Sequence, residues 1–114
     1  MQIRRDNWTG ANDTFSVLLN QESGDDSGAH YWRSIALLNL GKELQALADI
    51  NKYLKSNADD PDAYLVRAQI ATKMNNVAAA KVDATAALHR YQVGGDTNGA
   101  ARAQKFLDEL NAPH

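Results

Sequence analysis

The histidines are the first side chains to examine for chemistry, because a pair at helical spacing could bind a metal and a single one could act as an acid or base. His30, His89 and His114 lie far apart in the chain, and no two of them have the spacing of a metal-binding pair. His30 stands near an expected helix start, where a packing role is favoured over catalysis. No serine occupies a nucleophile turn. We therefore expect no catalytic site and no enzyme.

Three carboxylates cluster at Asp59, Asp60 and Asp62. Their spacing is not that of a calcium-binding loop, in which oxygen ligands alternate along twelve residues. Asp60 is followed by Pro61, and an aspartate before a proline is typical of a helix N-terminus. Helix starts therefore explain these residues, and no metal ion is expected.

The segment GGDTNG at 94–99 is rich in glycine, as phosphate-binding loops are. It follows no strand and lacks the lysine that such a loop carries. We interpret it as a connection between helices and expect no cofactor.

Composition limits the remaining functions. The 114 residues are 44% hydrophobic and 23% charged, with a net charge of −2 and no cysteine. Disulfides and thiolate metal sites are excluded, and the mixed charges give no basic surface for nucleic acid or anionic lipid. The first ten residues are not an intact signal peptide, and no apolar run is long enough for a membrane span. We expect a soluble protein, cytoplasmic by default and periplasmic or exported if a leader was removed.

Apolar residues recur at helical spacing, most clearly from Val77 to Tyr91, and strand-like alternation is absent from the sequence. Loop signals occur at 22–29, at Gly41, and at 57–63, 74–76 and 93–99. Asp60, Asn76 and either Asp96 or Thr97 are candidate N-caps. The predicted helices span residues 8–21, 29–40, 43–56, 62–74, 77–91 and 99–110.

The chain repeats itself at an offset of 34 residues. Six pairs of like residues share this offset: Ala29 and Ala63, Arg33 and Arg67, Leu40 and Met74, Ala46 and Ala80, Asp49 and Asp83, Leu54 and Leu88. Gly41 pairs with Asn75, and both tolerate a left-handed turn. Gly41 therefore ends the first helix of a helix pair.

Weaker matches at an offset of 35 extend the repeat in both directions. Trp8, Ala11, Phe15 and Leu19 precede Glu43, Ala46, Ile50 and Leu54 by 35, and the segment RAQ at 67–69 recurs at 102–104. We predict an all-α solenoid of antiparallel helix pairs, with two full units flanked by half units.

At these residues the sequence resembles a tetratricopeptide repeat protein, whose unit is a 34-residue helix-turn-helix. The matching positions are Tyr31, Ser34, Ala36, Gly41, Ala46 and Ile50 in one unit, and Tyr64, Ala68, Asn75, Ala80 and Ala84 in the next. The resemblance covers nearly all of 6–110. It implies one domain, 1–114: a partial repeat and loop (6–28), two repeats (29–61 and 62–95) and a C-terminal capping helix (96–114).

The pattern departs from the family at both ends. The final unit is one residue out of phase and lacks a second helix, and the N-terminal half unit lacks its first helix. Either Met1 is a cut within a longer array, or the exposed side of the 8–21 helix pairs with something else, such as a second copy.

The resemblance implies a non-catalytic scaffold that binds a protein segment in a groove lined by the first helices. The positions expected to contact the partner are Tyr31, Ile35, Leu38, Leu65, Gln69 and Lys73. This stripe is mainly apolar, and the basic residues with which some family members hold acidic tails are absent. We expect a partner helix or extended segment with apolar anchors, with Tyr31 and Trp32 as hot spots. The alternative for Trp32 and Leu38 is a place in the core.

Two other functions remain open. The incomplete first repeat could bury Trp8 and Phe15 against another copy, which would make the protein a self-assembling homo-oligomer. Alternatively, the protein could be a small chaperone that shields an apolar segment of a client.

Overall fold

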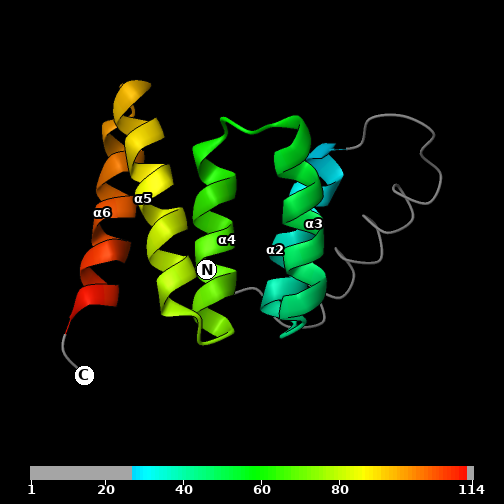
Figure 1. Cartoon of the computed structure of the whole chain (residues 1–114). Helices are drawn as coiled ribbons and strands as arrows, with labels where there is room; N and C mark the ends of the chain where they lie inside the picture. The colour runs from blue at the N-terminus through cyan, green and yellow to red at the C-terminus, as the bar shows by residue number, and fades with distance from the viewer. Residues whose placement is uncertain (1–26, 113–114) are drawn as a thin grey trace. The chain divides into compact units, whose positions relative to one another are not determined.

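The computed structural model describes residues 27–112, and these residues form α helices and no strands (Figure 1). The helices are α2 (Ser27–Asn39), α3 (Glu43–Ser56), α4 (Pro61–Lys73), α5 (Val77–Val93) and α6 (Thr97–Asn111). The chain divides into two compact units, Met1–Ala58 and Asp59–His114. The described part of the first unit is the pair α2 and α3, and the second unit contains α4, α5 and α6.

The all-α prediction is confirmed, and the helix bounds differ from the predicted ones by at most two residues. The predicted helix at 43–56 coincides with α3. Helix α4 begins at Pro61 because proline, whose missing N–H is not needed there, fits the first helical position. The predicted helix at 8–21 lies outside the described residues.

Helices α2, α4 and α5 each end in a turn of the same type. The second residue after each helix has a positive φ: Gly41 (78°), Asn75 (61°) and Gly95 (75°). The next residue then donates its N–H back to a carbonyl five residues earlier, as in the bond from Lys42 to Leu37 (2.9 Å). This Schellman arrangement satisfies carbonyls that a helix end leaves without partners. This turn explains why α2 ends just before Gly41 and a new helix begins at Glu43.

Side chains cap the starts of α4, α5 and α6, as the sequence predicts. The carboxylate of Asp60, the amide oxygen of Asn76 and the carboxylate of Asp96 each accept a bond from a backbone N–H in the first turn. The donor–acceptor distances are 3.0, 3.2 and 2.9 Å. Each cap satisfies a donor that has no partner within the helix.

In the first unit, α2 packs against α3, and both helices bury small residues. Ser34, Ala36 and Ala46 are fully buried. Asp49 of α3 is also buried, at 2% exposure, and both of its carboxylate oxygens accept bonds of 2.6 Å from Arg33 of α2. The Nδ1 atom of His30 lies 3.0 Å from the same carboxylate. A buried charge is thus paired within the helix pair.

The second unit repeats this ion pair. Arg67 of α4 donates two bonds of 2.9 Å to Asp83 of α5. Alanines again line the helix contacts, and one core cluster joins Ala68, Ala84 and Leu107 of three helices. No described helix is long and apolar enough to cross a membrane.

Helix α6 packs against α5 through a close contact between Gly99 and Tyr91. A Cβ at position 99 would lie 2.3 Å from the tyrosine ring, so any residue larger than glycine would clash with the ring in its present position. The Tyr91 hydroxyl donates to the carboxylate of Asp62 at the start of α4. Tyr91 therefore links all three helices of the unit.

Candidate functional site

In the first unit, the predicted contact residue Tyr31 belongs to an aromatic cluster with Trp32 and Tyr53. The Tyr31 ring lies 5.1 Å from the Trp32 ring and 5.2 Å from the Tyr53 ring, measured between centroids. Tyr31 is half-buried, whereas Trp32 is 54% exposed. Trp32 therefore presents a large apolar face to solvent, and its neighbour Tyr31 holds it edge to face.

Ile35 and Leu38 follow on α2, and both are half-buried. The neighbouring Asn39 is exposed and donates its side-chain N–H to the carbonyl of Ile35 at 2.9 Å. These two apolar side chains keep some surface, so a contact with a partner remains a prediction for them.

In the second unit, Gln69 and Lys73 are exposed on α4, and so is Thr72 between them. Leu65 differs, because it is only 8% exposed and packs in a core cluster with Ala87, Tyr91 and Ala103. Its side chain has little surface left for a partner, and we assign it a packing role. The predicted self-association residues Trp8 and Phe15 lie outside the described residues.

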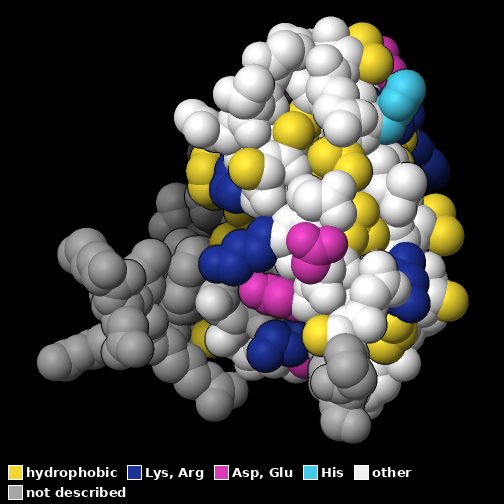
Figure 2. Space-filling model, turned by 90° about the vertical axis from the view of Figure 1, so that its left-hand side faces the viewer, with side chains coloured by type: hydrophobic (Ala, Val, Ile, Leu, Met, Phe, Trp, Pro, Cys, Tyr) yellow, Lys and Arg dark blue, Asp and Glu magenta, His cyan; other side chains and the backbone are white. Residues whose placement is uncertain are grey.

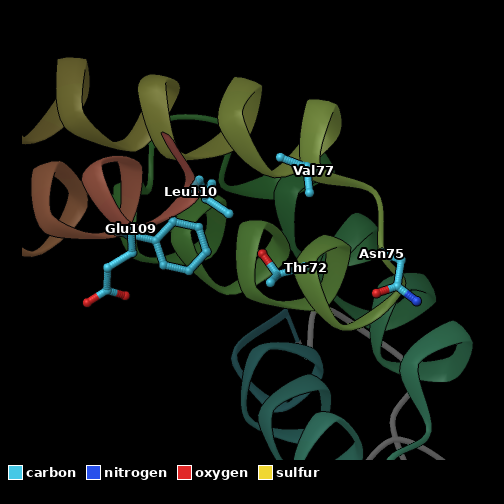
Figure 3. A pocket seen from close by; sticks show the side chains of 6 residues that line it. Thr72, Asn75, Val77, Glu109 and Leu110 are labelled. Carbon is cyan, nitrogen blue, oxygen red and sulfur yellow. The ribbon is translucent and has the colours of Figure 1, made fainter. Parts of the chain in front are cut away.

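A pocket of about 310 Å³ opens where the ends of three helices meet in the second unit (Figure 3). Its lining residues are Thr72 and Asn75 from α4 and the turn after it, Val77 from α5, and Phe106, Glu109 and Leu110 from α6. Figure 3 shows Leu110 near the end of α6 and Val77 at the start of α5, with Thr72 on α4 and Asn75 on the turn that follows it.

Sequence reasoning found only part of this pocket. Thr72 lies on α4 between the predicted contact residues Gln69 and Lys73, but Val77, Phe106 and Leu110 were not predicted as contact residues. The spacing of Phe106 and Leu110 by four places both on one face of α6, which was the available signal. The convergence of that face with the start of α5 is a tertiary feature.

A second hollow of about 380 Å³ is lined by Asp59, His89, Arg90, Val93 and Gly94. The Arg90 guanidinium lies 4.4 Å from the centroid of the Tyr64 ring and donates to the carbonyl of Ala86 at 3.3 Å. Arg90 thus has partners within the unit, which favours a structural role. In residues 27–112, no group of three His, Cys, Asp or Glu side chains is placed to hold a metal ion.

The surface carries both signs of charge. Seen from the α6 side, Lys and Arg side chains lie next to Asp and Glu side chains, with hydrophobic ones scattered between them (Figure 2). Such a face offers no extended field of one sign, so recognition by steering of a highly charged ligand is not favoured there.

No protein-family model matches the sequence, and no curated protein matches it. Among solved structures, PcrH from Pseudomonas aeruginosa is similar, with a TM-score of 0.82 and 18% identity over 94% of this chain and 81% of that one. A structure of PcrH in complex with the chaperone binding region of PopD is also similar, with a TM-score of 0.82 and 18% identity over 92% of this chain and 79% of that one. The chain thus has the same all-α helical-repeat fold as these structures.

Proposed function

We propose that this protein is a non-catalytic, chaperone-like member of the tetratricopeptide class that binds an apolar segment of a client protein. The main support is the fold shared with PcrH, which forms a complex with the chaperone binding region of PopD. The exposed Trp32 and the pocket beside Phe106 and Leu110 supply apolar surface suited to such a client.

The client contacts proposed on the first unit are Tyr31, Ile35 and Leu38, together with Trp32. On the second unit they are Gln69 and Lys73, both exposed on α4. Aromatic side chains provide large contact area at a small entropic cost, so Trp32 is the expected hot spot. Removing a hot spot costs at least about 2 kcal/mol, which is roughly a thirtyfold loss of affinity.

The test begins with affinity capture from native cells to identify clients, followed by calorimetry with the purified client segment. The variant is Trp32→Ala with Lys73→Glu, both at exposed positions. We expect it to bind the segment roughly thirtyfold more weakly, as expected for the loss of a hot spot.

The matched control is Leu44→Ser with Val82→Ser. These residues lie on the second helices α3 and α5 and are 73% and 68% exposed. We expect this control to bind as wild type does, and circular dichroism would verify the helicity of both variants. Undiminished binding by the Trp32 variant, or equal losses in both, would contradict the proposal.

Self-association through Trp8 and Phe15 remains a separate prediction. Light scattering at high protein concentration tests it, and a strictly monomeric mass would count against it.

A further inference from the structure

The pocket at the meeting of α4, α5 and α6 has firm walls. Phe106 packs against both core clusters of the second unit, so its ring is held in place from behind. Val77 is 44% exposed and Leu110 is half-buried, so both leave apolar surface open. A preformed apolar wall loses little entropy when a ligand binds.

The size of the pocket suits one large side chain. Its volume of about 310 Å³ is roughly twice that of the ~150 Å³ apolar cavities that take up benzene. A leucine, methionine or phenylalanine side chain fits within it, whereas a whole helix does not. The occupant is therefore a single anchor that projects from a longer segment.

Glu109 gives the pocket its charge. It is exposed, and among the described residues that line the pocket it is the only charged one. The other polar lining groups are neutral, and the Thr72 hydroxyl donates to the carbonyl of Ala68 at 3.0 Å. A carboxylate at the edge of an apolar pocket attracts a cation beside the anchor and disfavours an acid there.

We infer that this pocket takes one large apolar side chain of the client, and that Glu109 selects clients with a lysine or arginine next to that anchor. The inference rests on the proposed function, since it specifies which client sequences bind. The anchor is buried against Phe106, Val77 and Leu110, while its basic neighbour reaches the Glu109 carboxylate at the surface.

The test is a nuclear magnetic resonance titration of the full chain with three capped peptides. Their sequences are Ser-Leu-Lys-Ser, Ser-Leu-Glu-Ser and Ser-Ala-Lys-Ser. We expect the Leu-Lys peptide to shift the amide signals of Thr72, Val77 and Leu110 with the lowest dissociation constant. Exposed ion pairs contribute little to binding, so the Leu-Lys peptide should bind only about two- to fivefold more tightly than the Leu-Glu peptide.

Variants test the two parts of the inference separately: the charge preference set by Glu109, and the binding of the apolar anchor in the pocket. Glu109→Gln should abolish the preference for lysine over glutamate, whereas Asp108→Asn, a neighbour of equal charge outside the lining, should retain it. Val77→Phe adds volume to the pocket lining and should lower the affinity for both peptides that carry a leucine anchor.

Equal affinity of wild type for the Leu-Lys and Leu-Glu peptides would overturn the inference, as would shifts confined to residues outside the pocket. Shifts of the same amides on raising the protein concentration without peptide would also overturn it, because a second copy would then be the occupant. If the client segment loses affinity with Trp32→Ala and Lys73→Glu but Glu109→Gln changes nothing, the inference fails and the proposed function stands. If the peptides bind as expected but no client segment does, the proposed function fails, and the role of the pocket in client selection fails with it.

Discussion

The two arginine–aspartate pairs show what single residues contribute to this fold. Each pair joins residues 16 apart, on the first and second helix of one unit. The repeat offset of 34 residues showed that Arg33 is equivalent to Arg67, and Asp49 to Asp83. It did not predict that each arginine binds the aspartate of its own unit. An internal repeat identifies equivalent positions, whereas a contact depends on how two helices pack.

Replacing Asp49 by asparagine should destabilise the protein more than the same change at Asp83. Asp49 is 2% exposed and binds both Arg33 and His30, whereas the Asp83 side chain is 10% exposed and its bonds are longer. Breaking a buried ion pair costs roughly 3–5 kcal/mol, and Asp49→Asn should fall near the lower end because Arg33 keeps some exposure. Urea denaturation of both variants measures the difference.

Asp83→Asn serves as the matched comparison, and we expect it to lower the free energy of unfolding by about 1.5–3 kcal/mol, as for the loss of a hydrogen bond to a charged group. If Asp83→Asn lowered the stability as much as Asp49→Asn or more, burial of the carboxylate would not determine how much stability is lost.

At the scale of elements, the shared turn after α2, α4 and α5 predicts opposite effects of two substitutions. Gly41 and Asn75 have φ values of 78° and 61°. Gly41→Ala should cost about 1–2 kcal/mol, since a Cβ disfavours the left-handed conformation. Asn75→Gly should be neutral or stabilising by a few tenths of a kcal/mol.

The midpoint of thermal unfolding measures both changes. A Gly41→Ala variant as stable as wild type would mean that the turn relaxes to another conformation. Nothing lies within 4 Å of a Cβ built at Gly41, so crowding cannot explain a loss there.

Helix positions could be predicted because they depend on local chemistry. Asp60, Asn76 and Asp96 mark helix starts through hydrogen bonds within three residues, so the sequence alone indicates them. The contact surface was harder to predict. A stripe of residues on α4 defines a face, but only the packing of α5 and α6 shows that Leu65 is covered and Gln69 is not.

The outer face of α6 supports the expectation that it is a capping helix, which remains a proposal. At the offset of 35, the buried residues Val66 and Ile70 of α4 correspond to Ala101 and Lys105 of α6, and both of these are exposed. An apolar face has thus become a more polar one, as a terminal helix of a repeat array requires.

At the scale of the molecule, the division after Ala58 predicts that residues 59–114 fold on their own. This unit has three helices and two core clusters, and its ion pair and caps lie within it. A domain of this size is marginally stable, and repeat units gain further stability from their neighbours. We expect the fragment to be helical with a lower melting temperature than the full chain.

Circular dichroism with thermal melting tests this expectation. Asp83→Asn in the fragment provides the control, because it should lower the melting temperature further if the fragment has its native ion pair. A fragment without helical signal would show that the first unit is required for folding of the second.

The contact of Tyr91 with Gly99 also restricts the order of the units along the chain. At the offset of 35, Gly99 corresponds to Tyr64 of α4. If a second copy of α4 followed α5 in place of α6, it would bring a phenol ring to the place where even a Cβ meets the Tyr91 ring at 2.3 Å. Duplication of the second unit in tandem would therefore create a steric conflict at the new junction. Lengthening this array by gene duplication would require a compensating change at one of these two positions.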